Sequence, residues 1–232
     1  MPVKPIELYR QNGFQLIEGW CSEAIFDVIQ LVDDAGINSS GGVLEIGIHH
    51  GKLFLLLNQT VSPEYKSYAV DVFDDQHLNI DKSGGGSFSI FQNNLITYDH
   101  HKGGNTIIIK GDSLDSALDL PNVVGRGSMK YISIDGGHTV EHTLSDLKLA
   151  SELIKNTGVV LLDDILHPNW LGVIEGAVKF LSTHPTLVPF AIGHGKLFLS
   201  RLSYRDYYFN LFSNSGLITS TVKFFGWNLV VL

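Results

Sequence analysis

The stretch YISIDGGHTVEHTLSDLKLA, residues 131–150, predicts a buried strand, a glycine turn and an amphipathic helix in succession. The run of apolar residues up to Ile134 is typical of a strand that helices cover on both faces. Beyond the turn, apolar residues three and four apart predict a helix from about His138 to Asn156, with Gly158 as its stop. That apolar stripe consists of Val140, Leu144, Leu147, Ala150 and Ile154.

Similar short apolar runs recur along the chain and alternate with helical patterns. They span residues 43–46, 67–72, 106–110, 130–134 and 158–162, and a further helix is expected over 170–182. This order predicts an α/β fold, in which right-handed crossovers place helices on both faces of a mostly parallel sheet. We therefore expect a Rossmann-like, doubly wound sheet with three αβα layers.

The two ends of the chain differ from this pattern. Residues 187–192, 196–201 and 227–232 are strand-like, and the tight GHG at 193–195 joins the first two, which predicts antiparallel strands at the sheet edge. A helical segment is expected over about 14–36. We expect one domain overall, with residues 1–40 as an N-terminal helical cover and 41–232 as the main body.

Composition narrows the class of protein. The 232 residues are 44% hydrophobic, and 24 acids against 16 Lys and Arg give a formal net charge of −8. The acidic balance disfavours a nucleic-acid footprint, which needs clustered basic residues. The sequence has no apolar run of the ~18–20 residues that a membrane span needs, and its N-terminus has no signal-peptide core. With Cys21 as the lone cysteine, we expect a cytoplasmic protein with a small-molecule partner, and a homo-oligomer is possible.

Each of the five central strands ends at or near a carboxylate. In an open α/β sheet, ligands bind beyond the carboxyl ends of the strands, so these groups are expected to share one crevice. Asp and Gly also form ordinary turns, but their joint placement favours a site. The five places are Glu45-Ile46-Gly47-Ile48-His49-His50-Gly51, Asp71, Asp112-Ser113, Asp135-Gly136-Gly137-His138 and Asp163-Asp164.

The first and second of these places suggest a bound nucleoside. Glycines let the backbone approach a ligand, and the following helix offers free N–H groups to an anion. Asp71, about 20 residues further on, is placed to bond ribose hydroxyls. The first loop does not match G-x-G-x-x-G, because only Gly47 and Gly51 are present, which disfavours a nicotinamide enzyme.

Taken together, the motifs LEIGIHHGK, AVDVFDDQ, KGDS, YISIDGGHTVEHTLSDLKLA and GVVLLDD resemble class I S-adenosylmethionine-dependent methyltransferases. The resemblance covers about residues 40–200 and is closer to the branch of metal-dependent sugar and natural-product O-methyltransferases. It implies a loop of Glu45, Gly47 and Gly51 under the methionine part of the cofactor, Asp71 on the ribose, and Asp112 and Ser113 on the adenine. One departure is Leu53, where the family often has Ser or Thr.

The resemblance also implies a divalent metal ion held by Asp135, Asp163 and Asp164, with Asp135 beside the cofactor as well. Three neighbouring carboxylates repel one another, so a bound cation explains why they coexist. Oxygen ligands favour a hard ion such as Mg²⁺. The alternative is that Asp135 caps the following helix and the Asp163-Asp164 pair caps its own loop.

His138 is the candidate catalytic base, because the related enzymes carry their base three residues after this acid. A hydroxyl near a dication loses its proton more readily, and a neutral imidazole would accept that proton. A helix N-terminus disfavours imidazolium, so we expect His138 to be neutral. Its alternative role is that of a helix cap.

Other residues have weaker claims. His142 is expected to face solvent on its helix, whereas His167 is a second candidate for the site, and His49 and His50 lie in the cofactor loop. The polar, glycine-rich residues 73–94 are a candidate lid, with a loop of no function as the alternative. Residues 14–20 are a candidate apolar cover for the acceptor.

The leading hypothesis is metal-dependent O-methylation of a small hydroxylated acceptor. One alternative is a non-haem iron oxygenase, in which His138 or His167 would join Asp163 or Asp164 as ligands. Another is a catalytically silent module that binds the cofactor, and a third is a methyltransferase that needs no metal. The sequence does not identify the acceptor.

Overall fold

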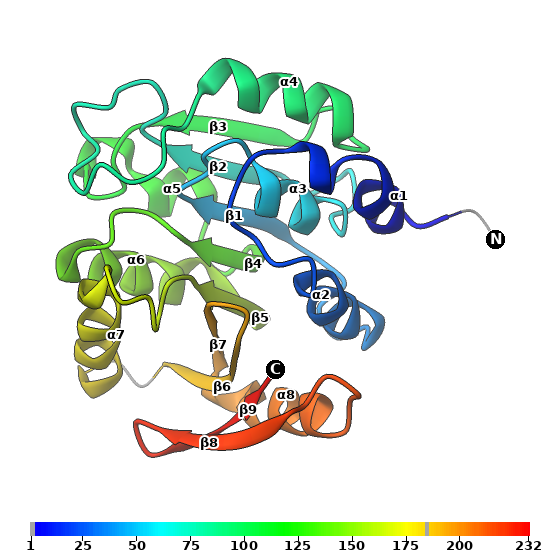
Figure 1. Ribbon diagram of the computed structural model, residues 1–232, viewed down its shortest axis with the longest axis vertical. Coiled ribbons are helices and arrows are strands. Elements are labelled where there is room, and N and C mark those ends of the chain that lie inside the picture. Colours follow the sequence, from blue (N-terminus) through cyan, green and yellow to red (C-terminus); the bar gives the residue numbers. More distant parts are fainter. Residues whose placement is uncertain (1–2, 184–185) are drawn as a thin grey trace.

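The computed structural model describes residues 3–183 and 186–232, and their strands form one twisted sheet (Figure 1). The strands are β1 (Gly42–Ile46), β2 (Ser67–Asp71), β3 (Thr106–Lys110), β4 (Met129–Ile134), β5 (Ile154–Leu162), β6 (Leu187–Gly193), β7 (Lys196–Arg201), β8 (Ser220–Phe224) and β9 (Trp227–Val231). The helices are α1 (Pro5–Asn12), α2 (Ile25–Asp34), α3 (Lys52–Asn58), α4 (Phe88–Tyr98), α5 (Leu120–Val124), α6 (Val140–Leu153), α7 (Leu171–Thr183) and α8 (Leu202–Ser213), with short 3₁₀ turns η1 (Phe14–Leu16) and η2 (Ser116–Leu118).

In the described residues the strand order is β3-β2-β1-β4-β5-β7-β6-β9-β8. Strands β1 to β5 are parallel, β7 is antiparallel to both β5 and β6, and β8 is antiparallel to β9. The chain leaves β1 toward β2 and β3 on one side and later returns to β4 on the other side. This reversal is the point at which an open α/β sheet binds its ligands. The predicted mostly parallel sheet with antiparallel C-terminal strands is confirmed.

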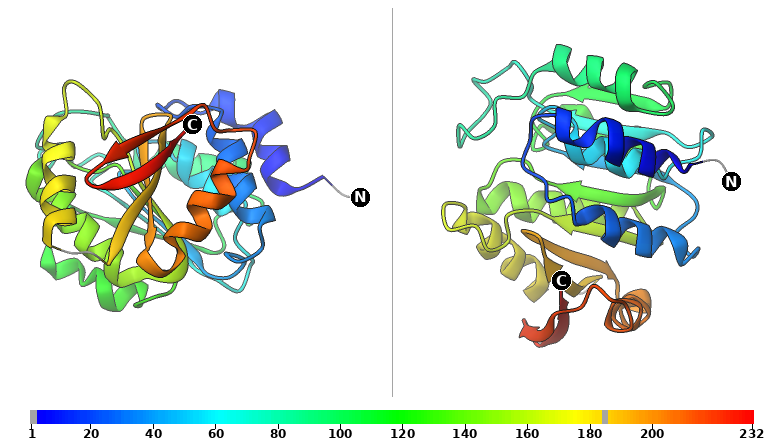
Figure 2. Two further views of the ribbon diagram at one scale, coloured as in Figure 1. Left: turned by 90° about the horizontal axis from the view of Figure 1, so that it is seen from below. Right: turned by 45° about the vertical axis from the view of Figure 1, so that its right-hand side comes forward.

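Helices cover both faces of the sheet, so the fold has three layers (Figure 2). Helices α1, α2, α3, α4 and α8 pack on one face around a core that includes Phe26, Phe54 and Tyr208. Helices α5, α6 and α7 pack on the other face around Leu147, Val160 and Phe180. Burial on both faces explains why the central strands are apolar at consecutive positions rather than alternate ones.

The structure corrects several predicted boundaries. Helix α6 ends at Leu153, and the chain continues as β5 through Gly158, which was expected to be a helix stop. Ile154 already pairs with Met129 of β4, so sheet pairing prevails over the helical period there. The expected helical segment over 14–36 is interrupted, because residues 17–24 connect η1 to α2 without helical structure.

Five helices and strands were not predicted as such, and one of them is α5, between β3 and β4. Helix α1 precedes the expected N-terminal helix, α8 and β8 lie in the tail, and α4 occupies the last part of the candidate lid, from Phe88 onward. We call the remainder, residues 73–87, the covering segment. None of the helices in the described part of the chain is long and apolar enough to cross a membrane.

Candidate active site

A cavity of about 710 Å³ lies at the carboxyl ends of the parallel strands, beneath the covering segment. In Figure 1 these strand ends point to the left, and the covering segment arches over them between β2 and α4. Most of the predicted site residues line this cavity, including Gly47, Asp71, Asp112, Ser113, Asp135, His138, Asp163 and Asp164. The acidic residues at the ends of the parallel strands thus line one cavity, as the sequence predicted.

Asp71 is joined directly to the glycine loop. Its Oδ2 accepts hydrogen bonds from the backbone N–H groups of Ile48 (2.5 Å) and His49 (2.8 Å), and its Oδ1 accepts one from Phe73 (2.6 Å). Gly47 has φ +85°, and a Cβ there would lie 1.8 Å from the carbonyl oxygen of Asp135. Only glycine fits this crossing of the loop after β1 with the end of β4.

Two residues of the predicted cofactor loop lie behind the cavity wall. Gly51, the N-cap residue of α3, has φ +87°, lies against the ring of Phe91 and does not line the cavity. Glu45 is 2% exposed and borders a smaller cavity of about 50 Å³ beside Gly47 and Asp135. Its Oε2 has no hydrogen-bond partner, and burial, followed by repulsion from Asp135, raises the pKa of Glu45 well above its usual value.

The expectation that His142 faces solvent is wrong. The side chain is only 6% exposed, and its Nε2 lies 3.2 Å from Oδ1 of Asp112 in the cavity wall. Thr139 caps α6 through the backbone N–H of His142 and lies 2.8 Å from its Nδ1. Because α6 packs against α5 and α7 as well as the sheet, more than its one apolar stripe is covered.

Asp135, His138 and Asp164 form an acidic cluster in the described part of the chain. One ligand atom from each lies within 4.8 Å of the others, and Nε2 of His138 is 3.2 Å from Oδ2 of Asp164 and 3.6 Å from Oδ1 of Asp135. Burial, followed by repulsion from Asp163, raises the pKa of Asp135 to about 7. Burial and the neighbouring acid therefore both disfavour the ionised form of Asp135.

Asp163, the third predicted metal ligand, has a different partner. Its Oδ2 forms an ion pair with Nζ of Lys196, a side chain that is 1% exposed at the start of β7. Burial opposes the charge on Lys196, but Asp163 and Asp135 raise the pKa of Lys196 above its usual value. Sequence reasoning missed Lys196, because an isolated lysine in an antiparallel strand has no motif around it.

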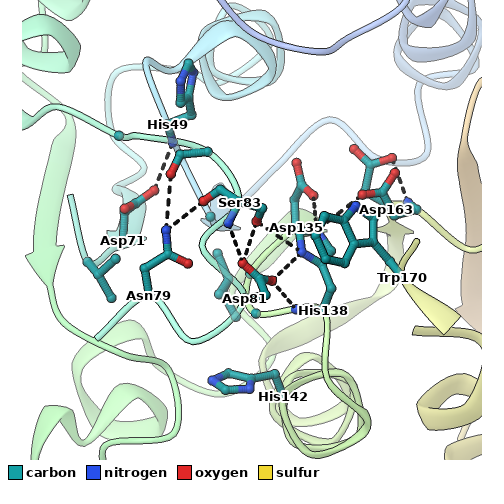
Figure 3. Close-up of a pocket in the computed structure, with 18 of the residues that line it drawn as sticks. His49, Asp71, Asn79, Asp81, Ser83, Asp135, His138, His142, Asp163 and Trp170 are labelled. Carbon is teal, nitrogen blue, oxygen red and sulfur yellow. Dashed lines mark hydrogen bonds and ion pairs between the residues drawn. The ribbon is translucent and has the colours of Figure 1, made fainter. Parts of the chain in front are cut away.

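His138 is held on three sides (Figure 3). Asp81, from the covering segment, lies 2.6 Å from Nδ1 and also accepts the backbone N–H of His138 at 3.0 Å. The ring of Trp170 stacks on the imidazole with centroids 4.6 Å apart. Burial disfavours imidazolium, but the nearby carboxylates of Asp135, Asp164 and Asp81 prevail and raise the pKa of His138 to about 10. The structure therefore contradicts our expectation that His138 is neutral, because three acids outweigh the helix terminus.

The weaker candidate residues differ in how they lie relative to the cavity. His167 lines the cavity near Trp170, with ring centroids 5.9 Å apart, and lies outside the acidic cluster of the described residues. His49 lines the cavity and stacks on His50, which is buried. Of residues 14–20, only Trp20 reaches the cavity in the described chain, and it remains 77% exposed.

Comparison with known proteins agrees with this geometry. A family model described as a methyltransferase domain matches residues 44–165, more than half of the 232-residue chain. The chain belongs to this methyltransferase family. The match extends from β1 to the residues after β5 and so includes all five acidic strand ends. No curated protein matches the sequence significantly.

Solved methyltransferase structures share the fold at low sequence identity. An O-methyltransferase from Bacillus cereus in complex with SAH has a TM-score of 0.58 and 14% identity, over 86% of this chain and 90% of that one. The O-methyltransferase NovP gives 0.58 and 17%, over 78% and 80%. CalS11, a TDP-rhamnose 3′-O-methyltransferase of calicheamicin biosynthesis, gives 0.55 and 15%, over 87% and 88%. The chain thus has the Rossmann-like fold of class I methyltransferases.

Proposed function

We propose that this protein transfers a methyl group from S-adenosylmethionine to a hydroxyl oxygen of a small acceptor, with help from a divalent metal ion. The observation that carries the proposal is that Asp71, beside the glycine loop, and His138, in the acidic cluster, line the same cavity. Membership of the methyltransferase family supports S-adenosylmethionine as the methyl donor. The acidic cluster is the place where we expect the acceptor hydroxyl to lose its proton. The Bacillus cereus neighbour, described in complex with SAH, supports the same donor.

The part of the cavity beside the glycine loop is the proposed cofactor site. Gly47 and Gly51 shape the loop under the methionine part, and Asp71 bonds the ribose hydroxyls. Glu45 is a buried carboxylate without a full set of partners, so it suits the cofactor's α-ammonium group. Asp112 and Ser113 line the cavity beside His142 and bind the adenine end.

His138 is the proposed base. S-adenosylmethionine supplies an electrophilic methyl group on a sulfonium centre. The acceptor hydroxyl gives its proton to Nε2 of His138, its oxygen bonds to the methyl carbon, and the carbon–sulfur bond breaks to leave S-adenosylhomocysteine. Only the neutral imidazole accepts this proton, so the imidazolium favoured by the surrounding acids must first be discharged.

The donor set fits a divalent cation. Nε2 of His138 is buried without a hydrogen-bond partner, and it faces Asp135 and Asp164. Asp135, Asp163 and Asp164 remain the proposed ligands, although Asp163 must share its charge with Lys196. A dication there would acidify the acceptor hydroxyl and disfavour imidazolium, and carboxylate ligands favour Mg²⁺ or Mn²⁺.

The iron oxygenase alternative is less well supported. It needs two histidines with one carboxylate, whereas the cluster found in the described residues combines one histidine with two carboxylates. Transfer of isotope-labelled methyl from S-adenosylmethionine to a panel of neutral phenols and sugars, with Mg²⁺ or with a chelator, tests the proposal. We expect the wild type to form labelled product, and the rate of its formation to fall by a factor of ~10²–10⁴ in His138→Gln. Oxygen-dependent turnover without methyl transfer would overturn the proposed function.

A further inference from the structure

Asp81 lies on the covering segment and contacts His138, a member of the acidic cluster. Its side chain and that of His138 are each 10% exposed, and 57 residues separate them in sequence. Oδ2 of Asp81 lies 2.6 Å from Nδ1 of His138 and accepts the His138 backbone N–H at 3.0 Å. Oδ1 accepts the backbone N–H of Ser83 at 2.8 Å and its hydroxyl at 2.6 Å. Both oxygens are therefore fully engaged.

These bonds fix the orientation of the imidazole. A carboxylate only accepts hydrogen bonds, so Nδ1 must carry the proton that lies between them. Nε2 then faces Asp135 and Asp164, at 3.6 Å and 3.2 Å. If the ring lost Asp81, it would be free to place its proton on Nε2 or to rotate away from the cluster.

We propose that Asp81 is a positioning residue for His138, and that it couples the orientation of the base to the docking of the covering segment. This inference rests on the proposed methyl transfer. Asp81 acts through His138 and does not touch the acceptor oxygen in the reaction we propose. Since it lies on a loop and not on a strand end, the base is correctly presented only when residues 73–87 cover the cavity.

The covering segment has contacts that support this coupling. Nδ2 of Asn79 donates to the carbonyl oxygen of Ser83 at 2.7 Å and to Oε1 of Gln76 at 2.8 Å, which holds the turn that carries Asp81. At the start of the segment, the backbone N–H of Phe73 donates to Oδ1 of Asp71 at 2.6 Å. One segment therefore contacts both the ribose-binding acid and the proposed base.

The test compares Asp81→Asn with Asp75→Asn, a matched change on the same segment. Asp75 pairs with Lys110 at 3.2 Å on the surface and lies away from the cavity lining. The first readout is the Nδ1–H proton of His138 in spectra of ¹⁵N-histidine-labelled protein, assigned by its absence in His138→Gln. We expect a downfield, exchange-protected resonance in the wild type and in Asp75→Asn, and its loss in Asp81→Asn.

The second readout is kinetic. In Asp81→Asn we expect kcat to fall by ~10²-fold or more while affinity for S-adenosylhomocysteine stays within about threefold. Ser83→Ala removes one of the four bonds to Asp81 and a 3.3 Å contact between the Ser83 hydroxyl and Nδ1 of His138. It should give an intermediate loss and serves if Asp81→Asn does not fold. A protected Nδ1–H resonance that survives in Asp81→Asn, or a kcat equal to that of Asp75→Asn, would overturn the inference. Failure of the wild type to methylate any acceptor would instead overturn the proposed function, while the spectra still decide the role of Asp81.

Discussion

Lys196 at the start of β7 forms a buried ion pair with Asp163, the first residue after β5. The antiparallel tail of the sheet thus places a fixed positive charge beside the acidic cluster. This charge neutralises part of the repulsion among Asp135, Asp163 and Asp164, and it competes with any metal ion for Asp163. We therefore expect the pair to affect both the stability of the site and its affinity for the divalent cation proposed above.

Lys196→Met should lower the stability of the metal-free protein and increase its stabilisation by Mg²⁺. Without metal, the free energy of unfolding should fall by ~3–5 kcal/mol, because the change leaves the largely buried carboxylate of Asp163 without its cation. With 10 mM Mg²⁺, the gain in Tm should exceed that of the wild type, because Asp163 becomes available to the cation. Thermal unfolding with and without Mg²⁺ measures both.

The matched control for this change is Lys179→Met, which breaks an exposed pair with Glu175 on α7. It should change stability by less than ~1 kcal/mol and leave the response to Mg²⁺ unchanged. A smaller Mg²⁺ response in Lys196→Met than in the wild type would show that Lys196 does not compete with the cation.

Glu45→Gln should weaken cofactor binding with little loss of stability. A buried carboxylate without a full set of partners destabilises the empty protein, so the amide should be tolerated when no ligand is bound. It should lower the affinity for S-adenosylhomocysteine roughly 10–100-fold, the usual value of a hydrogen bond to a charged group. Calorimetric titration measures this, with exposed Glu64→Gln as control, and equal affinities of the two variants would contradict the role of Glu45.

Asp146 should make stability depend on pH. Burial, with added repulsion from Asp112 and only partial opposition from Ser113, raises the pKa of Asp146 to about 7. Because the folded-state pKa lies above the unfolded value, the folded state holds the proton more tightly. The contribution of protonated Asp146 to the free energy of unfolding is full below about pH 4 and is lost as the pH rises toward 7 and beyond.

Asp146→Asn tests this directly by urea unfolding at pH 5 and pH 8. The wild type should lose more stability between these values than the variant, by roughly 2–4 kcal/mol. Parallel losses in the two proteins would show that Asp146 is ionised at both pH values.

The charge of the cavity predicts the class of acceptor. Among the lining residues that the structure describes there are six aspartates and no lysine or arginine, and Trp20, Ile80 and Trp170 add apolar surface. Diphosphate groups are usually bound by such basic side chains. We therefore expect neutral hydroxylated acceptors in preference to nucleotide-linked sugars, unlike CalS11, whose description names TDP-rhamnose.

Competition measures this preference. A neutral glycoside or phenol that is methylated should be inhibited less than about twofold by 1 mM TDP at saturating cofactor. Stronger inhibition by TDP, competitive with the acceptor, would show that the cavity accepts a diphosphate despite its acidic walls.

The sequence correctly predicts that the acids at the strand ends lie together at one edge of the sheet. Asp71 and Asp135 each follow a buried strand, and parallel strands end at the same edge, so short apolar runs suffice to place these acids together. The same reasoning could not find α8 or β8. The first mixes aromatic and polar residues without a clear stripe, and the second is a largely exposed edge strand.

Residues that reach the site from elsewhere escaped prediction. Asp81 lies in a polar loop whose path no periodicity fixes, and Lys196 comes from β7, the antiparallel neighbour of the β5 strand that Asp163 follows. His142 was misplaced because a helical wheel describes one buried stripe, whereas α6 is covered by two helices as well as the sheet. In each case tertiary packing, and not local pattern, decides the environment.

Calorimetric titration with S-adenosylhomocysteine tests the central claim most directly, that the crevice beyond these strands holds the methyl donor next to the acidic cluster. The account predicts one bound molecule per wild-type chain, an affinity that falls at least roughly tenfold in Asp71→Asn, and no change in Asp75→Asn. Absence of binding to the wild type, or equal affinities of Asp71→Asn and the wild type, would contradict it.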